Sequence, residues 1–505
     1  MKKLIILILL LILSCTSTFA IQEHFENLDC CNHHHHEKSK IVKNGDYLSI
    51  KDCVAIGLER SPIIKEYAYK LELAKANVGI TKASYFPELS AGIGMAQKFN
   101  SNTENYLKNY REIPTVGVTL QMMIFDFGKT LANIRMEQFL AISAEYEFLD
   151  SVCTTVFDIK THYYKLLEAK AEYEIQQMNY KYQEENIKKI KVLVKEKKKT
   201  SADLAYANTE LVKIKSIVIE KEIDYKNSIE NLNNAMYLEN APSYNIYETQ
   251  TFDIDSVVDK KFNYLANKKF DKIYKDDTIF QHPKYSYEEA VKIAYENSPD
   301  IKALNSTKNA MEQALLYVKR KYYPELNLGA GYDFINSNEE KNNGFTIAAN
   351  LSASINAMRQ KFDIKGSIAQ VNLAETQIKT FKSNLYFSVR KSLNVVNKTY
   401  NKIPVKKSQL KFAANNLNLI SENYYNNKAT QIEFETARNL YFNSLTEYVI
   451  AEYDYNSALI ALERAMHKHI IDYHDDAEHA IEYHNKNVGG ALSKMIYCNK
   501  NHKGK

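Results

Sequence analysis

The chain has 505 residues and carries 66 lysine and arginine residues against 61 acidic ones, a net charge of only +5. Such a balanced, intermixed charge argues against a dedicated nucleic-acid-binding protein, which would concentrate basic residues on one face. Glycine and proline are scarce, at 14 and 8 residues, which suits long uninterrupted helices. Beyond the first twenty residues no run of about 20 apolar residues occurs, which excludes a protein built from several membrane-spanning helices.

Residues 1–20 combine two lysines, an apolar stretch and small residues at the end. This pattern is typical of a secretory signal peptide, and we expect cleavage after Ala20. The alternative is a lipoprotein signal in which Cys15, preceded by Ile12-Leu13-Ser14, carries the lipid.

Residues 21–46 are polar and lack periodicity, so we expect a disordered segment. Cys30-Cys31 stand beside His33–His36, a pattern that could bind a soft transition metal. Because no second ligand group stands at a recognisable spacing, a solvated tail is favoured, and no metal, cofactor or catalytic site is predicted. The 6 cysteines form no paired framework, so no essential disulfide is expected.

One pattern occurs twice. The unit at 48–94 recurs at 285–331 with constant spacing, so that Ser61-Pro62 corresponds to Ser298-Pro299 and Phe125-Asp126 to Phe362-Asp363. A duplication of this length indicates two structural repeats. We therefore expect repeats at 47–235 and 285–466, a linker at 236–284 that packs around the middle of the molecule, and a tail at 467–505.

Each repeat opens with a helix that is broken at the Ser-Pro pair. Proline disfavours the helical conformation in the residue before it and suits the first turn of the next helix. The period then changes from 3.6 to 2, which predicts strands at about 88–99 and 115–124, and at about 325–334 and 345–355.

The predicted strands have one apolar face and one face of glycine, serine, threonine and asparagine. Each is roughly ten residues long, the length of a tilted transmembrane strand. This pattern indicates a barrel with lipid outside and water inside, with the lipid-facing positions Val116, Val118, Leu120, Leu328, Ile347 and Leu351. A half-buried hairpin in a soluble sheet is the alternative. Because four strands cannot close a barrel, an oligomer must supply the rest.

After Phe125-Asp126-Phe127-Gly128-Lys129 a helical pattern continues to about Glu196, turns near 197–201 and returns. Apolar residues at alternating spacings of three and four predict a coiled-coil seam in each hairpin; they are Leu149, Val152, Val156, Ile159, Tyr163 and Leu166, then Leu204, Ala207, Leu211, Ile214 and Val218, then Leu410, Ala413, Leu417, Ile420 and Tyr424, then Tyr441, Leu445, Tyr448, Tyr455, Leu459, Leu462 and Met466. A helix of about 67 residues would be a rod of about 100 Å. The offset between Thr200/Asp203 and Thr430/Glu433 is about one heptad smaller than the offset between the strands of the two repeats. This predicts a heptad deletion in the second repeat, with hairpins of slightly unequal length or slightly different start points.

Over roughly 48–466 these motifs together resemble the outer membrane efflux protein family, also called the TolC family. The motifs are the Ser-Pro-x-Ile-Lys helix start, two aromatic residues followed by Pro-Glu-Leu, the strand exit Ile124–Lys129, and the turns Thr200–Leu204 and Thr430–Phe434. The resemblance implies an α+β membrane protein: mainly long helical coiled-coil hairpins that form a periplasmic α-barrel, plus four strands per chain in a 12-stranded barrel of a homotrimer.

The resemblance also implies a function and partners. It implies a passive channel in the outer membrane that extends into the periplasm and exports small molecules, proteins or both. Its partners would be a periplasmic adaptor (membrane fusion) protein, an inner-membrane ABC or proton-driven transporter, and outer membrane lipid. The alternative is a periplasmic or surface coiled-coil structural protein such as an adhesin, which explains the heptads but not the strands. A histidine-rich metal-binding protein is a third hypothesis.

By resemblance the adaptor contacts the hairpin tips, at Lys197, Lys198, Lys199, Thr200, Asn427, Lys428 and Thr430. Glu433 falls on an acidic ring that narrows the periplasmic entrance, and Asp203 is its equivalent in the first repeat. The second ring position falls on the neutral Thr436, while Glu435 is expected on another face. The alternative is that Asp203 and Glu433 only cap their helices.

The chain departs from the family pattern in three places. The glycine-rich strand exit is missing from the second repeat, where Lys361–Gly366 reads KFDIKG. Lys197 and Asn427 stand where family turns usually carry a glycine. Asparagine adopts the left-handed conformation readily and lysine does so less readily, so we expect an altered adaptor contact at the first turn.

Overall fold

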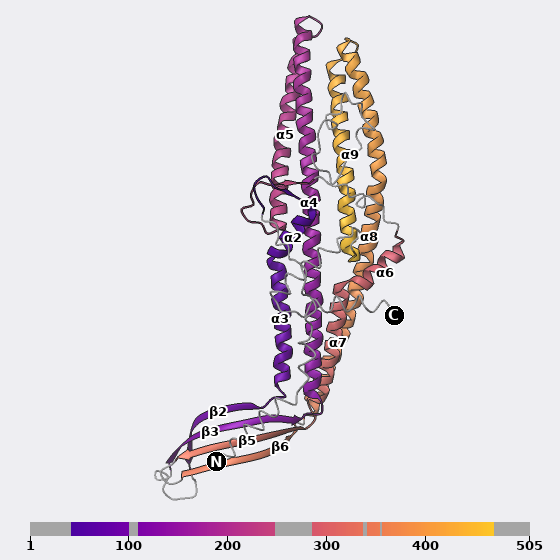
Figure 1. The fold of residues 1–505 in the computed structure, drawn as a ribbon. Helices are drawn as coiled ribbons and strands as arrows, with labels where there is room; N and C mark the ends of the chain where they lie inside the picture. The colour runs from indigo at the N-terminus through magenta and orange to yellow at the C-terminus, as the bar shows by residue number, and fades with distance from the viewer. Residues whose placement is uncertain (1–41, 100–109, 248–284, 337–340, 354–355, 469–505) are drawn as a thin grey trace, which may run out of the picture.

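The computed structural model describes residues 42–99, 110–247, 285–336, 341–353 and 356–468. The predicted signal peptide, Cys15, Cys30-Cys31, His33–His36, most of the linker and the tail beyond 468 lie outside these ranges. The molecule is a long helical rod with a strand sheet at one end and both helical hairpin turns at the other (Figure 1).

Each repeat supplies the same order of elements. The first repeat forms α2 (Ile50–Arg60), α3 (Pro62–Ala83), β2 (Glu88–Phe99), β3 (Tyr110–Phe125), α4 (Lys129–Lys195) and α5 (Ser201–Ala235). The second forms α6 (Tyr287–Asn297), α7 (Pro299–Arg320), β5 (Glu325–Asn336), β6 (Lys341–Ser352), α8 (Ala357–Tyr425) and α9 (Gln431–Met466). Two short strands, β1 (Tyr47–Leu48) and β4 (Asn245–Ile246), pair in parallel.

Serine caps explain the helix breaks. The Ser61 Oγ accepts a hydrogen bond from the backbone N–H of Ile64 at 3.3 Å, and Ser298 does the same for Ile301. Proline occupies the first helical position after each serine, where its missing N–H costs nothing. The sequence prediction of a break at each Ser-Pro pair is therefore confirmed.

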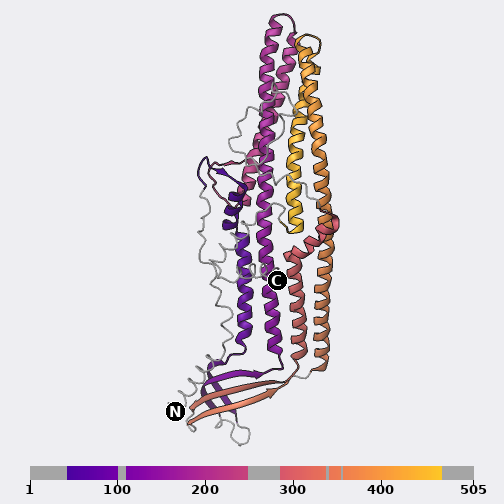
Figure 2. The same ribbon diagram turned by 45° about the vertical axis from the view of Figure 1, so that its right-hand side comes forward.

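The helices lie side by side in two stacked halves of the rod. α4 contacts α3 and α7 near the sheet and α5 and α9 near the tips, while α8 contacts α7 and then α9. Figure 2 shows α7 and α9 between α4 and α8. Most of the predicted seam residues are buried, namely Val152, Val156, Ile159, Tyr163, Leu166, Ala207, Ile214, Leu410, Ala413, Leu417, Tyr424 and all seven named on α9. The others are half-buried, namely Leu149, Leu204, Leu211, Val218 and Ile420.

The linker reaches the middle of the rod. Tyr163 on α4 donates a hydrogen bond from its hydroxyl to the backbone carbonyl of Tyr247 at 2.6 Å. This bond holds the segment after β4 against the helices, as expected for the described part of the linker.

The four long strands form one antiparallel sheet in the order β2-β3-β5-β6. β3 begins five residues before the predicted start, and β6 spans Lys341–Ser352 rather than 345–355. In the register Val118 lies opposite Ala91 and Tyr332, whereas Thr119 lies opposite Ser90 and Gly331. Since directly paired residues share a face, all six predicted apolar positions lie on one face and the small polar ones on the other.

The corner between β3 and α4 explains the Phe125–Lys129 motif. Phe127 and Gly128 are left-handed, with φ of 54° and 78°. Asp126 accepts hydrogen bonds from the backbone N–H groups of Gly128 and Thr130 at 3.0 and 2.6 Å. Arg320 donates to the Gly128 carbonyl at 2.9 Å, and a Cβ at Gly128 would lie only 2.7 Å from its Nη1. The left-handed backbone therefore favours glycine at 128, whereas the end of the flexible Arg320 side chain could shift to admit a Cβ.

The second repeat turns this corner differently. Asn356 caps α8 by accepting from the Arg359 N–H at 3.0 Å, while Asp363 lies inside α8 and accepts from the Tyr322 hydroxyl at 2.7 Å. The sequence match of Phe125-Asp126 with Phe362-Asp363 is therefore not a structural equivalence.

The heptad deletion predicted for the second repeat is wrong, whereas the alternative of different helix start points is confirmed: α4 begins after Phe125-Asp126, and α8 begins before Phe362-Asp363. α4 has 67 residues and α8 has 69, so the helix is not shortened. The strand hairpin is shorter instead, running from Glu325 to Ser352 compared with Glu88 to Phe125. Loop length between strands is tolerated because it changes no packed seam.

In the part of the chain that the structure describes, no helix has the length and apolar character needed to cross a membrane.

Candidate functional site

The two hairpin turns have the same backbone geometry. Lys197 and Asn427 adopt left-handed conformations with φ of 60° and 58°. The N–H of the following residue bonds back to the carbonyl five residues earlier, from Lys198 to Leu193 at 2.9 Å and from Lys428 to Asn423 at 2.7 Å. This is a Schellman ending, which favours glycine at the left-handed position. Lys197 adopts it nonetheless, at a cost of about 1 kcal/mol.

The returning helices begin with capping boxes. The Thr200 N–H donates to Asp203 at 2.9 Å, and the Thr430 N–H donates to Glu433 at 2.7 Å. Each threonine hydroxyl accepts from the N–H of its acidic partner in return. The capping role expected as an alternative is thus present at both acidic residues. Glu433 is exposed and Asp203 half-exposed, so both carboxylates still contribute charge to this end of the rod.

The three lysines of the first tip are not equivalent. Lys197 and Lys198 are exposed, and Lys198 pairs with Glu196 at 2.8 Å. The Lys199 Nζ donates to the Ala429 carbonyl at 3.3 Å and lies 3.8 Å from the centre of the Tyr424 ring. Burial lowers the pKa of Lys199. Lys199 therefore ties the first tip to the second, while Lys197 and Lys198 extend into solvent.

A buried group of charged residues lies behind the second tip. Arg438 on α9 forms an ion pair with Glu435 and lies 3.8 Å from the Glu210 carboxylate on α5. Glu435 also accepts hydrogen bonds at 2.8 Å from the side-chain amides of Gln183 on α4 and Gln431. Burial raises the pKa of Glu435. As expected from the sequence, Glu435 lies on a different face from the exposed Glu433.

Sequence analysis did not identify this buried group. Arg438 stands between Phe434 and Tyr441 in the seam pattern of α9, so a charge at a core position was the available signal. Two members of the group, Gln183 and Glu210, could not be found from the sequence because they belong to the other repeat.

The family profile described as outer membrane efflux protein matches residues 56–236 and 290–466. The fold is similar to that of the CmeC outer membrane channel of Campylobacter jejuni, at 14% identity and a TM-score of 0.67, covering 86% of this chain and 89% of that one.

Two further solved structures have a similar fold. The outer membrane protein VceC of Vibrio cholerae has 14% identity and a TM-score of 0.65, with 83% of this chain and 95% of that one covered. The MtrE outer membrane channel of Neisseria gonorrhoeae, in its open state, has 12% identity and a TM-score of 0.66, with 83% and 89% covered. The comparison with curated proteins gave no match.

Proposed function

Because the chain belongs to the outer membrane efflux protein family, we propose that it is the outer membrane channel of a three-part export system. Proteins of this family are channels rather than enzymes, and they lie in the outer membrane and extend into the periplasm. The observation that carries the proposal is a pair of apolar surfaces that a single chain leaves uncovered, on the two opposite edges of the rod.

One uncovered surface lies on α8. Val405, Phe412 and Leu419 recur at heptad spacing and are 63–71% exposed. The other lies on α5, where Val212, Ile219 and Ile223 are exposed. Figure 1 shows α5 and α8 on opposite sides of the half that carries the tips. A heptad stripe of this kind is a coiled-coil seam without its partner.

A contact between two different surfaces of neighbouring chains is heterologous. Such contacts close into a ring when the rotation that relates one chain to the next allows it. We infer that α5 of one chain packs against α8 of the next. Three chains, the number common to the family, would form a helical tunnel.

The strand sheet leads to the same arrangement. β2 and β6 are the outer strands of the sheet, and an open strand edge within lipid would leave backbone groups without hydrogen-bond partners. Pairing of β2 with β6 of the next chain removes these edges and produces twelve strands. The face carrying Val116, Val118 and Leu120 then contacts lipid, and the glycine- and threonine-rich face lines the pore.

The tips are the proposed docking site for a periplasmic adaptor, which connects the channel to an inner-membrane ABC or proton-driven transporter. Their exposed residues are Lys197, Lys198, Thr200, Asn427, Lys428 and Thr430. The transporter supplies the energy, and the cargo is small molecules, proteins or both. An adaptor with acidic residues would suit exposed lysines repeated around a ring.

Charge reversal tests the adaptor contact. Lys197→Glu with Lys198→Glu should reduce export while trimers still form, whereas Lys188→Glu, at an exposed position on α4 below the tip, should leave export unchanged. If export is unchanged in the double variant, the role of these lysines is only to keep the turn soluble.

Channel activity is tested by purifying the protein from the outer membrane and measuring single-channel conductance in a planar lipid bilayer. A heat-modifiable band of trimer size and discrete conductance steps are expected. A protein that is soluble without detergent and gives no conductance would instead be the coiled-coil structural protein considered above.

A further inference from the structure

Three potential metal ligands meet halfway along the rod. Asp150 on α4, Asp300 in the first turn of α7 and His467 directly after α9 each offer a ligand atom, and these atoms lie within 4.8 Å of one another. They line a cavity of about 320 Å³ together with Cys153 and Arg464. The two repeats therefore both contribute to this cluster, which lies far from the tips and from the sheet.

The backbone at His467 directs its ring into this cavity. His467 ends α9 in a left-handed conformation with φ of 45°, which is uncommon for a residue other than glycine and costs roughly 1–2 kcal/mol. The Nδ1 atom is shielded from solvent and has no hydrogen-bond partner. A buried ring nitrogen without a partner is costly unless it binds something.

The two carboxyl groups repel each other. Burial, with Asp150 and Glu147 nearby, raises the pKa of Asp300 to about 6. Two cations, Lys302 and Arg464, also lie near His467. A cation placed between the carboxylates would remove this repulsion.

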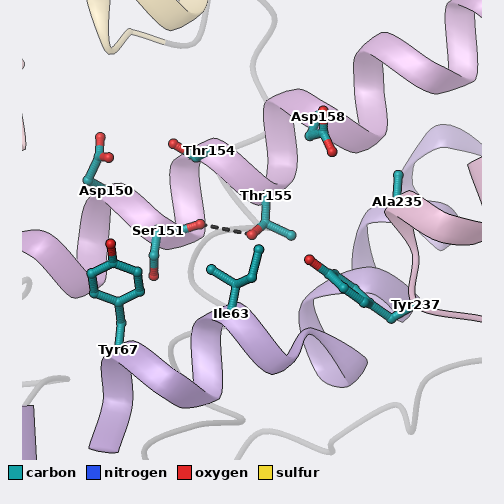
Figure 3. A pocket seen from close by; sticks show the side chains of 9 residues that line it. All are labelled: Ile63, Tyr67, Asp150, Ser151, Thr154, Thr155, Asp158, Ala235 and Tyr237. Atoms are coloured by element: carbon teal, nitrogen blue, oxygen red, sulfur yellow. Dashed lines mark hydrogen bonds between the residues drawn. The ribbon is translucent and has the colours of Figure 1, made fainter. Parts of the chain in front are cut away.

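Asp150 also lines a second cavity, which lies between α4 and the neighbouring helix α3. Ile63 and Tyr67 of α3 line this cavity too, and Figure 3 shows the Asp150 carboxyl group directed away from the Tyr67 ring. Asp150 therefore lies between the cavity that faces α3 and the cluster with α7 and α9.

We propose that Asp150, Asp300 and His467 bind a divalent transition-metal cation of the zinc class. Two carboxylate oxygens and one imidazole nitrogen suit such an ion, which takes oxygen and nitrogen ligands at about 2.0–2.2 Å and a fourth ligand from water. The ligand atoms lie within 4.8 Å of one another, so binding requires the three side chains to rotate until each reaches the ion. The ion would join α4 of the first repeat to α7 and the end of α9 in the second, and so act as a structural link.

Thermal unfolding of the full-length trimer in detergent tests this site, with ZnCl2 as the probe and EDTA as the reference. Because a ligand that binds only the folded state stabilises it, Zn²⁺ should raise the Tm of the wild type. Asp300→Asn and His467→Gln should abolish this increase. Asp158→Asn, at an exposed position on α4, should retain it.

The histidine-rich segment needs its own control. His33–His36 also offer imidazole ligands for Zn²⁺, but the proposed link is made by Asp150, Asp300 and His467, so replacing these four histidines with serine should leave the Tm increase intact. Asp300→Asn removes a repelling charge, so it should fold and its Tm in EDTA should not fall. Equilibrium dialysis should show that Zn²⁺ binding at one site weakens about ten-fold or more in this variant. An equal Zn²⁺-dependent Tm increase in wild type and both ligand variants, or no increase in the wild type, would overturn the proposal.

Discussion

In the strand sheet, the direction of single side chains decides what each residue contacts. Val118 and Thr119 are neighbours, both exposed in the single chain, but the pairing places them on opposite faces. The Ser90 and Thr119 hydroxyls lie 2.6 Å apart on the polar face. Hydroxyls on this face satisfy one another or water, while on the other face Val118 lies opposite Ala91 and Tyr332.

Lysine substitution distinguishes the two faces. Val118→Lys should block membrane assembly, because a lysine facing lipid near mid-bilayer costs about 2–4 kcal/mol and the trimer repeats that cost. Thr119→Lys should assemble, since its ammonium group remains in water. Outer-membrane fractionation followed by a trimer assay measures both. Equal assembly of the two variants would mean that the sheet faces are assigned incorrectly.

Glu433 combines a local role with a proposed role at the entrance. Its hydrogen bonds with Thr430 lower its pKa, so it stays charged at neutral pH. The capping contribution is therefore present above the ordinary pKa of a glutamate, and it is lost as the pH falls through the lowered value. Three such carboxylates around one axis would attract cations.

Glu433→Gln should shift the ion selectivity of the pore towards neutral without changing trimer stability, because the amide oxygen can still accept the cap hydrogen bond. Reversal potentials in a salt gradient measure this, with Glu222→Gln in the middle of the rod as the control. In the wild type, acidification should weaken the cation preference. Identical reversal potentials for wild type and Glu433→Gln would leave Glu433 with a capping role only.

Among the helices, buried charges set how the two hairpins contact each other. Arg438, Glu435 and Glu210 join α9 to α5, and Lys160 on α4 lies 3.7 Å from the Glu463 carboxylate on α9, also buried. A buried ion pair adds little net stability, but removing one partner leaves an uncompensated charge. These pairs therefore constrain which helix faces can meet.

Arg438→Leu should lower the free energy of unfolding by about 3–5 kcal/mol, since it leaves Glu435 and Glu210 buried without their cation. Adding Glu435→Gln should restore part of the loss. Thermal or denaturant unfolding in detergent measures the effect. Lys428→Leu, at an exposed tip position, should change stability by less than about 0.5 kcal/mol. A loss in Arg438→Leu no larger than in this control would show that the charges are not energetically coupled.

For the whole molecule, the uncovered seams on α5 and α8 are the features that require further copies. Phe412 is 71% exposed at the centre of the α8 stripe. Burial of a phenylalanine is worth about 1.5–3 kcal/mol, and a ring of three chains gains it three times.

Phe412→Asp should therefore reduce the fraction of trimer, whereas Lys411→Asp, at an exposed position on another face of α8, should not. Light scattering after size-exclusion chromatography gives the mass, and circular dichroism confirms that each chain keeps its helices. A trimer fraction unchanged by Phe412→Asp would place the subunit contact elsewhere.

The sequence by itself determined the elements and their order, because the signals for them are local. The Ser-Pro pairs, the threonine caps with acids three residues later, and the change of period from 3.6 to 2 all act within a few residues. The seam prediction succeeded for the same reason, since an apolar stripe on a helix is buried against whichever helix faces it.

Only the tertiary structure decided which distant residues meet. It showed that Lys199 crosses to the second tip, that Arg438 pairs with Glu210 of the other repeat, and that Asp150 and Asp300 converge on His467. It also placed the length difference between the repeats in the strand hairpin. Each of these depends on contacts between segments that are far apart in the chain, and such contacts are set by the geometry of helix packing rather than by any pattern within one helix.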